Sequence, residues 1–262
     1  MRFTKMQGLG NDYLYVYGDV PSDAAELSIK WSDRHFGVGS DGIIWVSDSD
    51  IADFKMSIFN ADGSEAMMCG NGVRCVGKFV YDKGLTDKTS LKIETRSGIR
   101  TLELQICNGK AIGASVDMGI SVISDEMELT IDGETVNLTP ISMGNPHAVI
   151  FVDDINNAPL STLGKKIEKH PAFPDGVNVE FVEVLGKNKL RMRVWERGSG
   201  ITMACGTGAC ASAVAAVNKG FCEFSAPITV TLDGGDLTIT VEPDLHVTMT
   251  GPATNVCDGE TM

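Results

Sequence analysis

Two cysteines in this chain of 262 residues stand in the same local setting. Cys69 is followed by Gly70-Asn71-Gly72 and Cys205 by Gly206-Thr207-Gly208, and each segment opens a run of residues suited to a helix. The free amides and the dipole at a helix start lower the pKa of a thiol, and glycines let a carboxylate approach those amides. Two such thiols, one on each face of a carbon next to a carboxylate, could remove a proton from one face and return a proton to the other. A single nucleophilic cysteine would need no twin, so the pair predicts inversion of a stereocentre.

The two motifs belong to a duplication of about half the chain. Gly10-Asn11-Asp12 recurs as Gly144-Asn145-Pro146, so the asparagines are 134 positions apart, and the two cysteines are 136 positions apart. Half of the chain is 131 residues, and the motifs keep their order in both copies. A tandem duplication therefore predicts two similar halves, which bring both cysteines to one site if the halves face each other.

Each half contains many short strand-like runs and one convincing helix. The apolar spacing predicts helices over residues 71–82 and 206–218, and the second has no polar face, as expected of an enclosed helix. The runs that are typical of strands are 14–17, 43–46, 54–59, 148–152, 179–184 and 237–241. This order of elements matches neither a Rossmann unit nor a helix bundle. We therefore expect an α/β (α+β) fold of two pseudo-symmetric domains, each a curled, mostly antiparallel sheet around a central helix.

The first of the two expected domains consists of two separate segments of the chain. The first comprises residues 1–113 with 251–262 and carries the Cys69 motif, and the second comprises residues 114–250 and carries the Cys205 motif. We expect the active site in the cleft between them.

Composition and charge exclude several classes of function. Hydrophobic residues make up 43% of the chain and charged residues 22%, which is typical of a globular protein. The net charge of −13 repels phosphate backbones and anionic lipids, so we expect neither nucleic acid nor a membrane as a partner. The N-terminal segment lacks the apolar stretch of a signal peptide, and no run is long enough to span a bilayer. The seven cysteines are therefore expected to be thiols in a reducing cytoplasm.

Other readings of these motifs are less well supported. The cysteine spacings of six between Cys69 and Cys75 and five between Cys205 and Cys210 do not fit the short gaps of zinc sites, so no metal is expected. The segment Gly37–Gly42 resembles a dinucleotide fingerprint, but strand-like residues follow it instead of a helix. The five cysteines outside the two motifs are expected to be small apolar residues.

The motifs resemble those of diaminopimelate epimerases, a family of amino-acid epimerases that work without pyridoxal phosphate. The matching segments are Lys5–Asp12, Phe59–Glu65, Met68–Cys75, Met143–Ala148, Gly176–Phe181, Trp195–Gly198 and Ala204–Gly208. The resemblance covers essentially the whole chain, and it implies interconversion of LL- and meso-diaminopimelate, between the lysine pathway and peptidoglycan precursor supply, by a two-base mechanism with Cys69 and Cys205. It also implies a cytoplasmic homodimer that needs no cofactor, with two domains closing over a small-molecule substrate. Proline racemases and phenazine-type isomerases share a related fold.

The resemblance also implies roles for further residues. Arg197 would hold the distal carboxylate of diaminopimelate as a bidentate fork. His147 and Glu196 would help the thiols to exchange protons, and an imidazole suits this role because it titrates near neutrality. The substrate-binding residues implied by the resemblance are Asn11, Asn60, Gly70, Asn71, Asn145, Asn178, Glu196, Arg197, Gly206 and Thr207.

Two positions depart from the family's pattern, and two alternatives to the leading function stay open. Gly42 stands where several members carry Gln, and Ile201 stands where an acidic residue is common. Both departures could tune substrate preference, so one alternative is a racemase for another amino acid that keeps the cysteine pair. The other is an amino-acid binding protein without catalysis, against which two thiols at helix starts argue.

Overall fold

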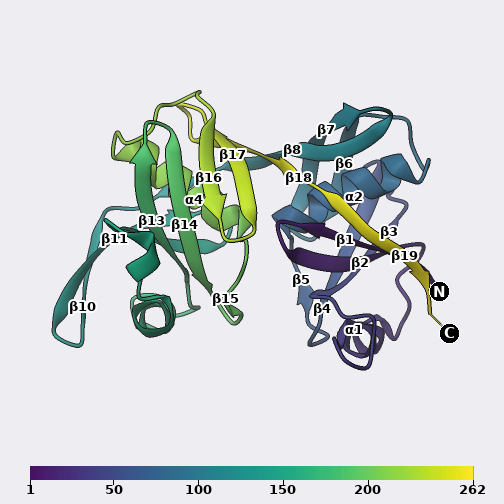
Figure 1. The fold of residues 1–262 in the computed structure, drawn as a ribbon, viewed down its shortest axis with the longest axis horizontal. Coiled ribbons are helices and arrows are strands. Elements are labelled where there is room, and N and C mark those ends of the chain that lie inside the picture. The colour runs from purple at the N-terminus through teal and green to yellow at the C-terminus, as the bar shows by residue number, and fades with distance from the viewer. Residues whose placement is uncertain (262) are drawn as a thin grey trace. The chain divides into compact units, whose positions relative to one another are not determined.

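The computed structural model describes residues 1–261 and consists of two compact units (Figure 1). The first unit contains Met1–Asp117 together with the chain from Thr250, and the second contains Met118–Met249. The chain passes from one unit to the other within strands β8 (Lys110–Ile120) and β18 (His246–Pro252). Met262, which the sequence analysis assigned to the first half, lies outside the described residues.

The first unit is a strand-rich unit with two helices. Its strands, besides β8, are β1 (Arg2–Gly8), β2 (Asn11–Tyr17), β3 (Gly42–Ser47), β4 (Phe54–Asn60), β5 (Glu65–Ala66), β6 (Ser90–Thr95), β7 (Gly98–Cys107) and β19 (Thr254–Glu260). Its helices are α1 (Ala24–Ser32) and α2 (Gly70–Asp82). Strand β2 pairs with β1 antiparallel and with β3 parallel, and β19 pairs with the other edge of β1.

The second unit has a similar succession of elements. Its strands, besides β18, are β9 (Val122–Ile123), β10 (Met127–Ile131), β11 (Glu134–Ser142), β12 (Pro146–Phe151), β13 (Asn178–Gly186), β14 (Lys189–Glu196), β15 (Gly200–Ile201), β16 (Ile228–Leu232) and β17 (Gly235–Val241). Its helical segments are η1 (Ile155–Asn157), η2 (Leu160–Gly164), α3 (Lys165–Glu168) and α4 (Gly206–Asn218). Strand β12 pairs with β13 in parallel, as β2 does with β3 in the first unit.

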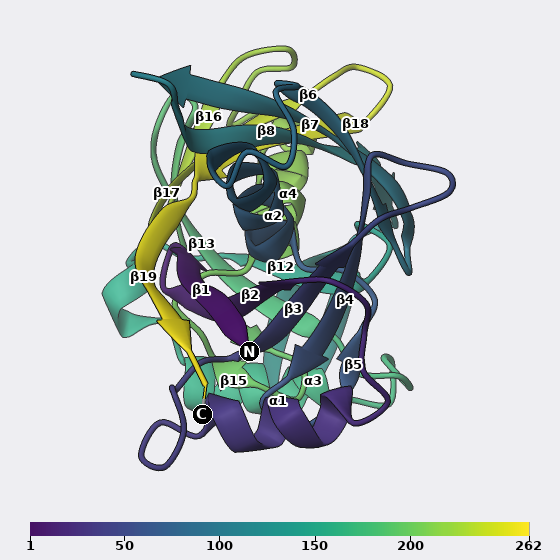
Figure 2. The same cartoon turned by 90° about the vertical axis from the view of Figure 1, so that its right-hand side faces the viewer.

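In the first unit, strands β1, β2 and β3 lie between the two helices, while β6, β7 and β8 lie on the other side of α2 (Figure 2). Helix α2 packs against β1, β2 and β7, and α1 packs against β3 and β4. Side chains alternate between the two faces of a strand, so neighbouring residues of one strand pack against different helices. Ile43 and Trp45 belong to the apolar cluster that includes Ala24 and Trp31 of α1, while Ile44 contacts the start of α2.

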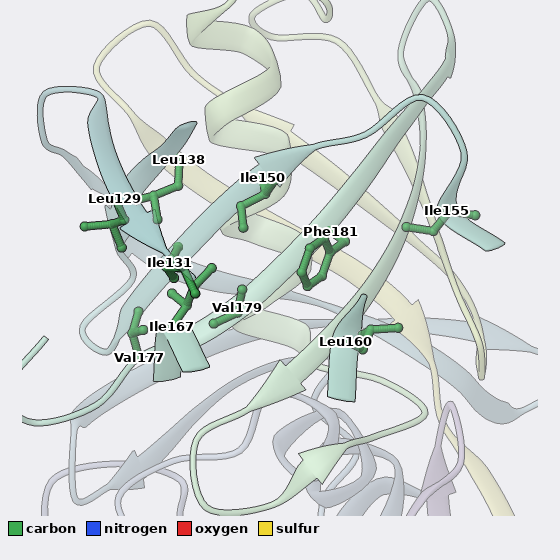
Figure 3. Packing of buried hydrophobic residues seen from close by; sticks show 11 residues of the cluster. Leu129, Ile131, Leu138, Ile150, Ile155, Leu160, Ile167, Val177, Val179 and Phe181 are labelled. Atoms are coloured by element: carbon green, nitrogen blue, oxygen red, sulfur yellow. The ribbon is translucent and has the colours of Figure 1, made fainter. Parts of the chain in front are cut away.

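The same alternation organises the second unit. Helix α4 packs against β11, β12, β13, β14, β16 and β17. On the other side of β12 and β13, Ile150, Val179 and Phe181 join an apolar cluster with residues of η1, η2 and α3 (Figure 3). The residue between Val179 and Phe181 is Glu180, which therefore faces α4.

The prediction of a mixed α/β fold that is rich in strands is confirmed. Both predicted helices are present as α2 and α4, and the six strand-like runs all fall on strands, with only Val152 outside its strand. Helix α1 and the segment η2–α3 are additional to the central helix predicted in each half. Helix α1 buries Ala24, Ser28, Trp31 and Ser32, and with two serines on its buried side it lacks the apolar periodicity that marks a helix in a sequence. No helix within residues 1–261 is long and apolar enough to cross a membrane.

Candidate active site

Cys69 and Cys205 are the N-cap residues of α2 and α4. Both have extended backbone angles, and each sulfur accepts a hydrogen bond from the amide of the third residue of its helix, Gly72 or Gly208, at 3.3 Å in both cases. Each thiol is thus fixed at the positive end of a helix, beside amides that have no partner within it. The seven cysteines are free thiols, as predicted.

In the first unit, the side chain of Asn11 is fixed beside Cys69. The Cys69 thiol donates to Oδ1 of Asn11 at 3.3 Å, and Nδ2 of Asn11 donates to Oδ2 of Asp41 at 2.8 Å. Arg34 donates to the other oxygen of Asp41 at 2.9 Å. Asp41 therefore orients the amide that meets the thiol, a role that the sequence analysis did not assign to it.

Buried polar groups support the start of α2. Arg74 is fully buried, and its guanidinium donates to the Gly70 carbonyl at 3.3 Å and to Oδ1 of Asn71 at 3.1 Å. The Tyr15 hydroxyl donates to the Gly72 carbonyl at 3.2 Å, and burial raises the pKa of this phenol. The side chain of Asn71 is thus oriented by Arg74, while its backbone amide belongs to the first turn of the helix.

Asn60 and Gly42 lie together where β3 pairs with β4. Oδ1 of Asn60 accepts from the Tyr13 hydroxyl at 3.3 Å, and its Nδ2 donates to Ser64 at 3.1 Å. A Cβ on Gly42 would stand 2.2 Å from the carbonyl oxygen of Phe59 and 2.9 Å from the Tyr13 ring. The backbone here therefore leaves no room for a side chain at position 42, where the sequence analysis found a departure from the family's pattern.

In the second unit, Cys205 lies among polar side chains that are largely enclosed. Thr207 Oγ1 is 3.6 Å from its sulfur, and Glu196 interacts with the same thiol while accepting a hydrogen bond from Thr202. Burial raises the pKa of the Cys205 thiol well above its ordinary value, and the carboxylates of Glu196 and Glu180 raise it further. Burial also raises the pKa of the Glu196 carboxyl, and the nearby Glu180 adds to this effect.

The expectation of a lowered thiol pKa was therefore wrong for Cys205. The amides of α4 favour the thiolate, but the loss of water and the two neighbouring carboxylates outweigh them. Cys205 thus retains its proton near neutral pH.

His147 links Cys205's surroundings to a buried carboxylate. Oε1 of Glu180 accepts from Nδ1 of His147 at 2.7 Å, and Nε2 lies 3.2 Å from Oδ1 of Asn145. Nδ2 of Asn145 donates to Thr207 Oγ1 at 3.3 Å. The structure therefore brings His147, Asn145 and Thr207 together around Cys205. Glu180 was missed, although a charged residue inside the apolar run Val179–Val182 was a signal that could have identified it.

Asn178 and Arg197 form a separate group. Oδ1 of Asn178 accepts from the backbone amide of Arg197 at 2.9 Å, and the Arg197 guanidinium donates to the Asp175 carbonyl at 2.9 Å. A cavity of about 390 Å³ lies beside Arg197 and is lined also by Glu168, His170 and Phe173. Asn178 thus acts on the Arg197 backbone, while Arg197 lines a cavity that could receive an anionic group. Within residues 1–261, no cluster of three or more His, Cys, Asp or Glu residues suits a metal ion.

Comparison with known proteins identifies the family. The chain matches the family described as diaminopimelate epimerase over residues 3–123 and 139–256. It is 52% identical to a diaminopimelate epimerase from Methanococcus maripaludis over 99% of both chains, and 50% identical to one from Acetivibrio thermocellus over 99% of this chain and 98% of the relative.

Solved structures with the same fold are more distant in sequence. A phenazine biosynthesis protein of the PhzF family from Bacillus anthracis has a TM-score of 0.81 at 15% identity and covers 100% of this chain and 99% of its own. A hydroxyproline epimerase from Agrobacterium vitis has a TM-score of 0.74 at 15% identity, with coverage of 100% and 90%. At this identity these two structures show the fold alone. The sequence matches confirm the resemblance and the prediction of an enzyme of the isomerase class. The chain belongs to the diaminopimelate epimerase family.

Proposed function

We propose that the protein interconverts LL- and meso-diaminopimelate without a cofactor, with Cys69 and Cys205 as its two bases. The observation that carries the proposal is the matching geometry of the two thiols, each an N-cap that accepts from a glycine amide at 3.3 Å. The relatives at about 50% identity, which are diaminopimelate epimerases, support the choice of substrate.

The proposed reaction is a proton exchange at the α-carbon. One cysteine, as thiolate, takes the α-proton, and the electron pair of the broken C–H bond moves onto the carboxylate to give an enolate-like intermediate. The other cysteine, as thiol, gives its proton to the opposite face of the carbon. The amides at the starts of α2 and α4, including Gly70, Asn71, Gly206 and Thr207, would stabilise the charge on the carboxylate oxygens. This mechanism requires the two halves to close over the substrate, with the active site between them.

The remaining roles follow from the chemistry of a substrate with two amino-acid centres. Arg197 beside its cavity would hold the distal carboxylate, and the proposed asparagine contacts are Asn11, Asn60, Asn145 and Asn178. His147 and Glu196 would return the thiols to their starting protonation states after each turnover. We further propose that the enzyme works in the cytoplasm as a homodimer, in lysine and peptidoglycan precursor synthesis, with neither nucleic acid nor a membrane as a partner.

Incubation with LL-diaminopimelate in deuterated water tests the proposal directly. We expect meso-diaminopimelate with deuterium at the inverted α-carbon, and no product from the Cys69→Ala or Cys205→Ala variant, which are matched controls for the two half-sites. Inversion of another amino acid in place of diaminopimelate would instead identify a racemase with a different substrate. Binding of diaminopimelate without deuterium incorporation would identify a binding protein.

A further inference from the structure

The two half-sites differ in the residue that lies under the start of the helix. Each carries a glycine as the third residue of its helix, Gly72 in α2 and Gly208 in α4. A Cβ on Gly72 would meet methyl groups, Cδ1 of Ile44 at 2.8 Å and Cε of Met56 at 3.0 Å. A Cβ on Gly208 would meet Oε1 of Glu180 at 2.6 Å and the Cys205 sulfur at 3.2 Å. The carboxylate and the sulfur are thus neighbours across a space that only a glycine leaves open.

The strand registers show that Ile44 and Glu180 occupy equivalent positions. Ile44 pairs with Tyr15 in the first unit, and Glu180 pairs with Val149 in the second. Tyr15 and Val149 are 134 positions apart, which is the offset between Asn11 and Asn145. The duplicated scaffold therefore places an apolar side chain in one half and a carboxylate in the other.

Packing of the helix alone does not explain a carboxylate at position 180. The side chain of Glu180 is fully buried, and its Oε2 has no hydrogen-bond partner among residues 1–261. An enclosed carboxylate that lacks a partner on one oxygen costs stability, whereas an isoleucine fits the equivalent place in the first unit. Its other oxygen holds His147, which begins the chain of contacts through Asn145 and Thr207 to Cys205.

We propose that Glu180 is a positioning residue of the Cys205 half-site, which fixes the His147 ring through Nδ1 and holds a negative charge beside Cys205. The titratable side chains that face this end of α4 are His147 from β12, Glu180 from β13 and Glu196 from β14. Burial and the carboxylate of Glu196 raise the pKa of the Cys205 thiol most, and the charge of Glu180 adds to them. Cys205 therefore carries the proton before the reaction, and it is the proton donor in the direction in which Cys69 takes the α-proton. This last step rests on the proposed two-base function, while the effect of the charge on the thiol does not.

Alkylation of Cys205 in the full-length protein, followed by peptide mass spectrometry over a range of pH, tests the proposal. Glu180→Gln removes the charge and keeps an oxygen for Nδ1 of His147, so the midpoint of the pH profile should fall by about one pH unit, a tenfold change in the thiolate fraction. Glu180→Asp keeps the charge and should leave the midpoint near that of the unaltered protein. Glu183→Gln is the matched control, because Glu183 lies three positions along the same strand and its carboxylate accepts from the Ile155 amide instead.

Each outcome decides the role of Glu180. A lower midpoint in Glu180→Gln alone supports the proposal, whereas an unchanged midpoint, or an equal shift in Glu180→Asp or Glu183→Gln, overturns it. If Glu180→Gln does not fold, Glu180→Ile gives the second half the residue type of the first and should show the same lower midpoint. With diaminopimelate, Glu180→Gln should reduce kcat and leave KM unchanged, because Glu180 does not touch the substrate. The alkylation profile remains informative if diaminopimelate is not the substrate, so failure of the proposed function and failure of this inference are distinguishable.

Discussion

Replacing Gly208 or Gly72 with alanine compares the two half-sites with each other. Both glycines are the third residue of a helix, where alanine is favoured over glycine by about 1 kcal/mol, and this gain cancels when the two variants are compared. At Gly208 the new methyl group must displace the buried Glu180 carboxylate, which lies 2.6 Å from its position. At Gly72 it meets the apolar ends of Ile44 and Met56, which have no hydrogen bond to lose when they shift. Overpacking of a buried site costs about 1–3 kcal/mol, so Gly208→Ala should be less stable than Gly72→Ala by about that amount.

Thermal unfolding of the two variants at equal concentration measures this difference. For a chain of this size, each kcal/mol corresponds to roughly 2–4 °C in Tm, so Gly208→Ala should unfold several degrees below Gly72→Ala. Its kcat should also fall by about tenfold, which corresponds to 1.4 kcal/mol, because displacement of Glu180 also moves His147. Equal Tm values, or a lower Tm for Gly72→Ala, would show that Glu180 does not occupy the space over Gly208 in solution and would refute the reasoning.

Three further predictions concern the chemistry of the site. Cys69→Ser and Cys205→Ser should both epimerise poorly, yet each should eliminate halide from a halogenated analogue of opposite stereochemistry at the reacting carbon, as measured by halide release; a preference for the same stereoisomer contradicts the assignment of one thiol to each face. Burial raises the pKa of Glu196 above its ordinary value of 4.5. Between these two pKa values the native state keeps a proton that the unfolded chain has released, so the stability of the native state falls as the pH rises through the native pKa. Glu196→Gln lacks this loss, so its Tm relative to the unaltered protein should increase between pH 4 and pH 8; a constant difference argues against a raised pKa. Epimerisation should survive dialysis against a chelator and a carbonyl reagent, and activity that returns only with pyridoxal phosphate or a divalent metal would contradict a cofactor-independent reaction.

The helix starts could be predicted from the sequence because their determinants are local. A thiol that caps its own helix and the glycines that follow it lie within four residues of one another, and both helices begin where the motifs place them. Most strands could also be predicted from the sequence, since residue type and length suffice to identify them. Helix α1 could not be predicted in this way, because Ser28 and Ser32 lie on its buried side and interrupt the apolar pattern. Ser28 is buried because its hydroxyl donates to the carbonyls of Phe59 and Asn60.

The environment of Cys205 could not be predicted from local sequence. Glu180 faces this thiol only because β13 pairs with β12 in one register, and a shift by one residue would turn it to the apolar cluster on the other face. The carboxylates that raise the pKa of Cys205 come from β13 and β14, 25 and 9 positions away in the chain. The start of α4 lowers the pKa of the Cys205 thiol, but burial by these strands raises it by more. The motif around Cys205 shows only the first of these two influences.

The pairing of β19 with β1 has a consequence for how the chain is made. Arg2 on β1 pairs with Glu260 on β19, while the whole of the second unit lies between these strands in the sequence. As the chain leaves the ribosome, the second unit can therefore complete its sheet while β1 still has an open edge. An open edge can pair with a strand of another chain until β19 covers it. Stalled synthesis or proteolytic loss of the last strand would then leave nascent chains that aggregate through the first unit while the second unit is folded.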